Sequence, residues 1–318
     1  MLVVLASDVF TNAVEWIGVI FGLTRSAVGA VVAAIGSSLP ETMVAIVALL
    51  YLRDLQSQAI GIGAVLGAPF MLSTIVFFLI GTTALLRAPS RSHKLHVSVP
   101  DTLFGTTLFA FTFALALGAS FVREHGAHVA AAVCVLGSYA LYLIYHLRSR
   151  KVEAEESPPP LRLTPSHARP RRRAVFVQLI LALIVTIFAS RWFVASVGHA
   201  STALGLSPFL VSLFLAPIAT ELPDASNVVL WMRRRKDDLA MGTVIGAMMF
   251  QTSVASAIAM VATPWTLDRT AYVPSAIALL SVLLLVGVTL IRRRVEPLIL
   301  LAGGALYVGY LVYAVVGK

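Results

Sequence analysis

Charged residues and cysteine are both scarce in this chain. Only 12% of its 318 residues are Asp, Glu, Lys or Arg, whereas 58% are hydrophobic. A soluble core cannot absorb that composition, so we expect lipid to be the solvent for most of the chain. The single cysteine, Cys134, excludes an intramolecular disulfide and is expected to pack in an apolar helix. No basic residues precede the first apolar run, so we expect no cleavable signal peptide.

Patterns typical of catalysis and of soft-metal binding are also missing. No cluster of His or Cys offers ligands for a soft metal, and no motif pairs a nucleophile with a base. We therefore expect neither an enzyme nor a resident cofactor. The net charge of +9 does not indicate nucleic-acid binding, because the basic residues lie in short loops between apolar runs.

Apolar runs of about 20 residues, the length that crosses a bilayer, follow one another along the chain. They predict an all-α membrane protein of ten transmembrane helices, near residues 2–22, 26–51, 58–86, 98–121, 127–147, 174–197, 205–232, 239–263, 270–291 and 296–316. Matching motifs divide these helices into two five-helix repeats, 1–147 and 174–318. Residues 148–173 between them are rich in charge and proline, and we expect a flexible loop with nothing to bury.

The distribution of basic residues predicts the orientation of the helices. With the N-terminus outside, nineteen Lys and Arg residues fall in cytoplasmic loops and four on the outer side. Both termini are then outside and the central loop is cytoplasmic, and the compact loops favour a bacterial-type inner (plasma) membrane. Because each repeat has an odd number of helices, the second repeat is inverted relative to the first. Trp16, Trp192, Trp231 and Trp265 lie near predicted helix ends and are expected to be interfacial anchors.

Two similar strings carry carboxylates inside apolar runs. They read Gly36-Ser37-Ser38-Leu39-Pro40-Glu41 and Ala219-Thr220-Glu221-Leu222-Pro223-Asp224, each in the second apolar run of its repeat. A carboxylate at membrane depth costs about 3 kcal/mol or more and marks a candidate functional site. Two of them in matching places indicate a transporter whose site lies between the repeats.

These strings offer only oxygen ligands. Each proline removes a backbone hydrogen bond and frees a carbonyl one turn earlier. The hydroxyls and carboxylates that the strings add are those of Ser37, Ser38, Thr220, Glu41, Glu221 and Asp224. Such an environment suits a hard cation such as Ca²⁺ or Na⁺. The simpler alternative is that each proline kinks a packing helix and each acid pairs with a buried cation, for which Arg191 is the one intramembrane arginine.

A Gly-x-x-x-Gly pair follows in both repeats, Gly63 with Gly67 in the third predicted helix and Gly242 with Gly246 in the eighth. Small residues at this spacing often serve close helix packing in membranes. Their place after the Pro-acid helix in both repeats favours a second role, a close approach of these helices to the site.

The two Pro-acid strings resemble the alpha-repeats of the calcium/cation antiporter superfamily, which includes the sodium/calcium exchangers. Members of that family carry a Gly-Thr-Ser-Leu-Pro-Glu-type string in helices two and seven of ten, arranged as two inverted sets of five. The resemblance covers essentially the whole chain. It implies alternating-access antiport of inorganic cations across a lipid bilayer. It also implies that Glu41 and Asp224 are central ligands and that Ser37, Ser38 and Thr220 contribute oxygens.

The chain departs from the family pattern in its third and eighth predicted helices, where the family typically reads Gly-Asn-x-x-Gly-Ser-Asn-x-x-Asn. No polar side chain occurs from Gly63 to Leu72, and only Thr243 and Gln251 remain in the matching stretch, so Gln251 joins the candidate ligands. Ligands for flanking sodium ions are therefore missing, whereas Glu221 adds an acid. We expect exchange of a cation such as Ca²⁺ for H⁺ or for fewer Na⁺, with Glu221 as an additional titrating group. The alternative is a non-transporting relative that binds a cation as a sensor or scaffold.

Overall fold

The computed structural model describes residues 2–20, 34–52, 54–87, 95–148, 159–164 and 170–316. No strand occurs among these residues, which are helical apart from short connections. In chain order the helices are α1 (Leu2–Ile20), α3 (Ala34–Ile46), η2 (Val47–Leu52), α4 (Leu55–Met71), η3 (Leu72–Val76), α5 (Phe77–Leu86), α6 (Val99–Ala119), α7 (His125–Arg148), α8 (Arg172–Leu204), α9 (Pro208–Arg233), α10 (Asp237–Phe250), η4 (Gln251–Ala255), α11 (Ser256–Ala262), α12 (Arg269–Arg292) and α13 (Pro297–Val316). The η elements are short π-helical stretches, in which the backbone hydrogen bonds span five residues.

Seven helical stretches within the described ranges are long and apolar enough to cross a membrane, and counting α9 as one span gives an eighth. The two parts of α9, Pro208–Glu221 and Ala225–Arg233, meet at 48°. Proline at position 223 lies at this bend and cannot donate a helical hydrogen bond. The all-helical membrane class is confirmed, whereas the count of ten helices and the inversion of the repeats remain predictions.

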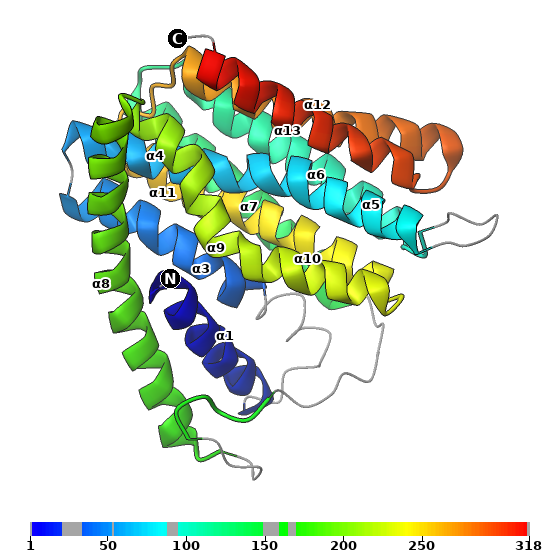
Figure 1. Cartoon of the computed structure of the whole chain (residues 1–318), viewed down its shortest axis with the longest axis horizontal. Helices are drawn as coiled ribbons and strands as arrows, with labels where there is room; N and C mark the ends of the chain where they lie inside the picture. The colour runs from blue at the N-terminus through cyan, green and yellow to red at the C-terminus, as the bar shows by residue number, and fades with distance from the viewer. Residues whose placement is uncertain are drawn as a thin grey trace.

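The most extensive contact between the halves, among the described residues, joins α4 and α9, which lie side by side (Figure 1). A Cβ atom on Gly67 of α4 would lie 2.5 Å from the carbonyl oxygen of Leu213 in α9, and Gly63 faces α9 at a similar distance. The Ser212 hydroxyl also donates to the Ile60 carbonyl oxygen across this contact, at 2.7 Å. Any larger residue would force the two backbones apart, so this glycine pair serves close packing.

The second glycine pair differs from the first. A Cβ atom on Gly242 of α10 would meet no atom of the described residues within 4 Å. The close packing that the sequence predicts for both pairs is therefore confirmed for Gly63 and Gly67 and is wrong for Gly242.

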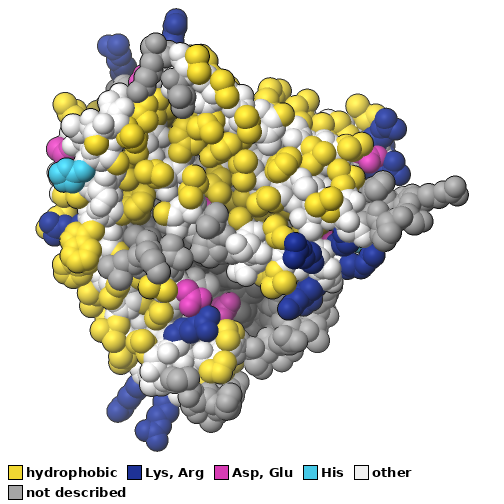
Figure 2. Space-filling model, viewed as in Figure 1, with side chains coloured by type: hydrophobic (Ala, Val, Ile, Leu, Met, Phe, Trp, Pro, Cys, Tyr) yellow, Lys and Arg dark blue, Asp and Glu magenta, His cyan; other side chains and the backbone are white. Residues whose placement is uncertain are grey.

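The outer surface is mainly apolar. Figure 1 shows α12, α13, α5 and α6 on one flank of α9 and α10, with α1 and α8 on the other. Hydrophobic side chains cover much of the upper part of the face in Figure 2, and many Lys and Arg side chains lie at the margins, with others beside acidic side chains in the lower centre. This distribution fits a protein whose sides face lipid. Cys134, expected inside the packing, lies on an exposed face of α7.

Two of the four tryptophans are not interfacial anchors. Trp265 is completely buried, and its indole N–H donates to the Ala116 carbonyl oxygen at 2.7 Å. Trp16 is also buried and donates to the Pro159 carbonyl oxygen at 2.9 Å. Both indole N–H groups donate to carbonyl oxygens inside the protein. A position near a predicted helix end does not reveal such a partner. Trp192 is 70% exposed, as expected of an anchor.

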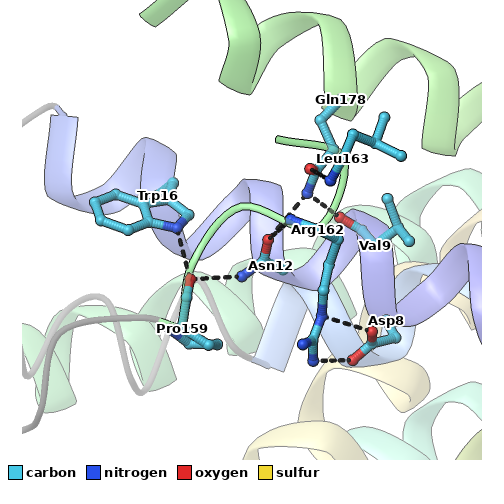
Figure 3. A network of polar contacts seen from close by, with 8 residues as sticks. All are labelled: Asp8, Val9, Asn12, Trp16, Pro159, Arg162, Leu163 and Gln178. Carbon is cyan, nitrogen blue, oxygen red and sulfur yellow. Dashed lines mark hydrogen bonds and ion pairs between the residues drawn. The ribbon is translucent and has the colours of Figure 1, made fainter. Parts of the chain in front are cut away.

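Part of the central loop packs against α1 and α8 (Figure 3). In this loop segment, residues 159–164, Leu161 is only 1% exposed. The side chain of Gln178 in α8 donates to Asn12 of α1 at 3.0 Å and accepts the backbone N–H of Leu163 at 2.9 Å. The expectation that the loop has nothing to bury is therefore wrong for this segment, because the Leu161 side chain is buried and the segment's backbone is hydrogen-bonded to α1 and α8.

An ion pair joins the end of α5 to the start of α10. The Arg87 guanidinium donates two hydrogen bonds to the Asp237 carboxylate, at 2.6 and 2.8 Å, and a third to the Met232 carbonyl oxygen. The backbone N–H of His96 also donates to Asp237, at 3.0 Å. The hydrogen bond to Asp237 raises the pKa of Arg87, so the arginine stays ionised. This pair fixes the first half of the chain to the second at one end of the molecule.

Candidate cation site

The first Pro-acid string lies in α3 and its acid is buried. Glu41 is 2% exposed, and Ser38, three residues earlier on the same helix face, is 1% exposed. The Thr42 hydroxyl donates to the Ser38 carbonyl oxygen at 2.9 Å. The helix therefore holds a carboxylate and a hydroxyl together in the interior.

Gln251 reaches this acid from the other half of the chain. It is the first residue of η4 and is completely buried. Its amide nitrogen donates to a carboxylate oxygen of Glu41 at 2.8 Å and to the Ser38 carbonyl oxygen at 3.2 Å. Two candidate ligands 210 residues apart in sequence thus form one cluster.

Two oxygens of this cluster are still available as ligands. The Ser38 hydroxyl and the Gln251 amide oxygen are buried and have no hydrogen-bond partner among the described residues. Buried polar atoms of this kind normally bind a protein group, water or an ion. Together with the Glu41 carboxylate they form an acidic, all-oxygen environment, which fits a hard cation.

The second string lies in α9, which packs against both α3 and α10. Glu221 is 2% exposed and Thr220 is 5% exposed. The Thr220 hydroxyl donates to the Ala216 carbonyl oxygen at 2.8 Å, one turn earlier, and keeps its lone pairs for another partner. A second buried acid thus lies on a helix that contacts α3, which carries Glu41, and α10, which leads into Gln251.

Two predicted ligands lie outside the side chains that the structure describes, Ser37 and Asp224. Among the side chains it does describe, no three His, Cys, Asp or Glu residues gather closely enough to hold a metal ion. The described geometry therefore unites Ser38, Glu41 and Gln251.

The π-helical stretches η3 and η4 are site features that the sequence analysis missed. They begin at equivalent positions of the two repeats, Leu72 and Gln251, when Gly63 is aligned with Gly242. In η3 the Ser73 hydroxyl donates to a backbone carbonyl four residues earlier, and Ser253 does the same in η4. Such stretches widen the helix and occur frequently at functional sites. The sequence signal that could have indicated them is a pair of adjacent hydroxyl residues at matching positions, Ser73-Thr74 in the first half and Thr252-Ser253 in the second.

The site is asymmetric between the repeats. Gln251 reaches Glu41 from η4, whereas the equivalent residue of η3 is Leu72, which cannot coordinate a cation. The second half therefore supplies a polar side chain, Gln251, that contacts the first half. The first half has an apolar side chain, Leu72, at the equivalent position.

Arg191 does not pair with the site acids. Its guanidinium lies over the Tyr51 ring at 4.6 Å from the centroid, and one N–H donates to the Tyr51 hydroxyl at 3.2 Å. No carboxylate of the described residues lies within 4.0 Å of it. The alternative in which this arginine neutralises Glu41 or Glu221 is thus not supported.

Comparisons with known proteins agree with this architecture. The family model described as "Sodium/calcium exchanger protein" matches residues 1–148 and 174–316. The protein named "Putative antiporter CaxA" from Alkalimonas amylolytica is 25% identical over 98% of this chain and 94% of its own length. Inner membrane protein YrbG from Escherichia coli (strain K12) is 23% identical over 93% of this chain and 88% of its own length.

Solved structures share the fold. The H⁺/Ca²⁺ exchanger CAX superposes with a TM-score of 0.76 at 18% identity, over 98% of this chain and 79% of that one. The sodium-calcium exchanger NCX_Mj superposes with a TM-score of 0.61 at 19% identity, over 98% and 94%. The chain therefore belongs to the sodium/calcium exchanger family, a family of integral membrane cation antiporters and not of enzymes.

Proposed function

We propose that this protein is a secondary active antiporter that exchanges Ca²⁺, or another hard cation, for H⁺ or Na⁺ by alternating access. The contact between Gln251 and Glu41 carries the proposal. It joins a buried carboxylate of the first half to a buried amide of the second half, so a bound cation would link both halves. Asp224, Ser37 and Thr220 are proposed to complete the coordination.

We further propose that H⁺ is the counter-ion. Glu221 is a second buried acid, and a carboxyl group can carry the exchanged proton. Leu72 occupies the position that would hold a polar ligand in a symmetric site, which argues against several bound Na⁺ ions. Loss of the proton on cation binding would couple the two fluxes.

The proposed framework has ten transmembrane helices in two inverted repeats, 1–147 and 174–318, with both termini outside and the central loop cytoplasmic. The Arg87–Asp237 pair then lies on the cytoplasmic side, since it joins ends of helices next to predicted cytoplasmic loops. The sensor or scaffold alternative is not favoured, because CaxA, CAX and NCX_Mj, each similar over 98% of this chain, are named as an antiporter or as exchangers.

Uptake of ⁴⁵Ca²⁺ into proteoliposomes tests this proposal. The purified full chain is reconstituted and given an outward H⁺ gradient, an outward Na⁺ gradient or neither. Antiport predicts uptake with one gradient and none without it, and the effective gradient identifies the counter-ion.

The matched variants are Glu41→Gln and Glu124→Gln. Both remove one carboxylate charge, but Glu41 is buried in the site whereas Glu124 is exposed in the turn before α7. Gradient-driven uptake is expected to disappear only with the first change. Uptake that survives Glu41→Gln would remove this residue from the transport site. Absence of uptake with every gradient would move the proposal to another cation.

A further inference from the structure

A pocket of about 960 Å³ lies away from the candidate cation site, between α8 and the turn that joins η2 to α4. Leu52, Ile60 and Val194 supply apolar lining, and Arg191 and His199 supply polar groups. The margin of the molecule that contains this turn and α8 shows basic, acidic and histidine side chains among hydrophobic ones (Figures 1 and 2). The pocket is therefore amphipathic and lies at a helix end.

Arg191 is a cation without a counter-ion in the described structure. Among the described residues it contacts the neutral side chain of Tyr51, through one hydrogen bond and a ring contact. The guanidinium carries five N–H donors, so most of its capacity remains open. A charged side chain on a membrane-spanning helix is costly unless an opposite charge or water compensates it.

The acid in the same pocket does not supply that charge. Asp54 caps the N-terminus of α4, accepting the backbone N–H of Ser57 at 2.9 Å and its hydroxyl at 2.5 Å. These hydrogen bonds lower the pKa of Asp54, so it is ionised but directed at the helix end. The positive end of the α4 dipole offsets this charge and leaves Arg191 uncompensated.

The side chains next to Arg191 along α8 face outward. Trp192 is 70% exposed and Phe188 is 58% exposed, and both line the pocket. Exposed Trp on a membrane helix is typical of the level of the lipid headgroups. A phospholipid places a phosphate at that level and acyl chains along the apolar surface beside it.

We propose that this pocket binds an anionic bilayer phospholipid, with the headgroup phosphate on Arg191 and an acyl chain against Phe188 and Trp192. A planar guanidinium matches a phosphate with two parallel hydrogen bonds. His199 lines the same pocket and adds a donor for a remaining phosphate oxygen. The proposal is independent of the transported ion.

Native mass spectrometry of the delipidated full chain tests the proposal, with phosphatidylglycerol and phosphatidylcholine as probes. Arg191→Gln is expected to weaken the first phosphatidylglycerol-binding step by about tenfold. The matched control is Arg123→Gln, which removes an exposed arginine in the turn before α7 and should leave binding unchanged. Ala195→Phe fills the pocket at an exposed position without changing charge, and it should cause a similar loss.

A second readout places the lipid. Phosphatidylglycerol with brominated acyl chains should quench the fluorescence of Trp192, and Trp192→Phe should remove the quenched component. Unchanged binding by both Arg191→Gln and Ala195→Phe would overturn the proposal. Equal binding of phosphatidylcholine, or displacement by free glycerol phosphate, would also overturn it, because the site would then select neither an anionic nor a membrane lipid.

Discussion

Gln251 donates to Glu41 across 2.8 Å, from the first residue of a π-helical stretch to the acid of a Pro-acid helix. The contact spans the two halves of the chain and lies in the protein interior. It holds the acid on one side and leaves the Gln251 amide oxygen without a described partner. Rotation of the amide by 180° about its last side-chain bond would exchange donor for acceptor. In the proposed transport cycle, the same side chain would bind the carboxylate when the site is empty and the cation when the site is filled.

The role of Gln251 is tested by Gln251→Leu, which is similar in size and removes both the donor and the amide oxygen. We expect the apparent Ca²⁺ affinity in the proteoliposome assay to fall by about tenfold, the effect of one lost polar contact. Thr243→Val, on α10 outside the cluster, is the control. An unchanged affinity in Gln251→Leu would show that the amide is not a ligand.

Glu221→Gln tests proton coupling. If Glu221 carries the exchanged proton, competition by H⁺ weakens Ca²⁺ binding as the pH falls in the wild type. The amide cannot titrate, so the apparent affinity should become nearly independent of pH over the neutral range. The measurement is ⁴⁵Ca²⁺ uptake at a series of pH values, and a wild-type pH profile in the variant would reject the role of Glu221.

Asp237→Asn tests the ion pair between α5 and α10. The Asp237 side chain is fully buried and that of Arg87 is 12% exposed, so the change leaves a nearly buried positive charge without its counter-ion. We expect a loss of about 3 kcal/mol or more in unfolding free energy. Thermal unfolding in detergent measures it, and Arg87→Met added to Asp237→Asn should recover part of the loss.

The ion pair also predicts a pH dependence. The pKa of Arg87 is raised in the folded protein, so its contribution to stability is present below the unfolded pKa and is lost only as the pH rises through the folded value. The difference between wild type and Asp237→Asn should therefore persist at neutral pH. A difference that vanished there would contradict the pairing.

Gly67→Ala and Gly242→Ala form a matched pair for the helix contacts. The new Cβ would lie 2.5 Å from a backbone oxygen of α9 at the first position and in open space at the second. We expect a destabilisation of about 1–3 kcal/mol at Gly67. At Gly242, we expect a neutral effect or a gain of up to about 1 kcal/mol, because alanine favours the helix. Equal shifts in thermal unfolding would contradict the packing.

The packing of loop segment 159–164 on α1 and α8 is tested by Gln178→Leu, with Asp8→Asn as the comparison. The first change removes hydrogen bonds to α1 and to the segment from a fully buried position, and should cost about 1–3 kcal/mol. The second change weakens the ion pair of Asp8 with Arg162, which is half exposed on both sides, and should cost less than about 1 kcal/mol. Limited proteolysis of the central loop should accelerate only with Gln178→Leu.

The sequence by itself determined the class of protein and the location of the acids. A composition with so few charged residues indicates that lipid is the solvent for most of the chain. A carboxylate that follows a proline inside an apolar run, in both halves, indicates a functional site. Ser38, Glu41 and Gln251 were all named from the sequence, and the structure places them in contact. These signals are local, since hydropathy and motif are read along one stretch of chain.

Tertiary structure alone decided which of these residues meet and which features serve packing. Nothing in the sequence distinguishes Gly67, which faces the α9 backbone, from Gly242, beside which no described atom lies within 4 Å of a Cβ position. Trp265 has the sequence position of an anchor, but its indole donates to a buried carbonyl oxygen. Leu161 lies in a loop of the sequence, but its side chain is buried. These outcomes depend on the distance between segments far apart in sequence, and that distance follows from how the whole set of helices packs.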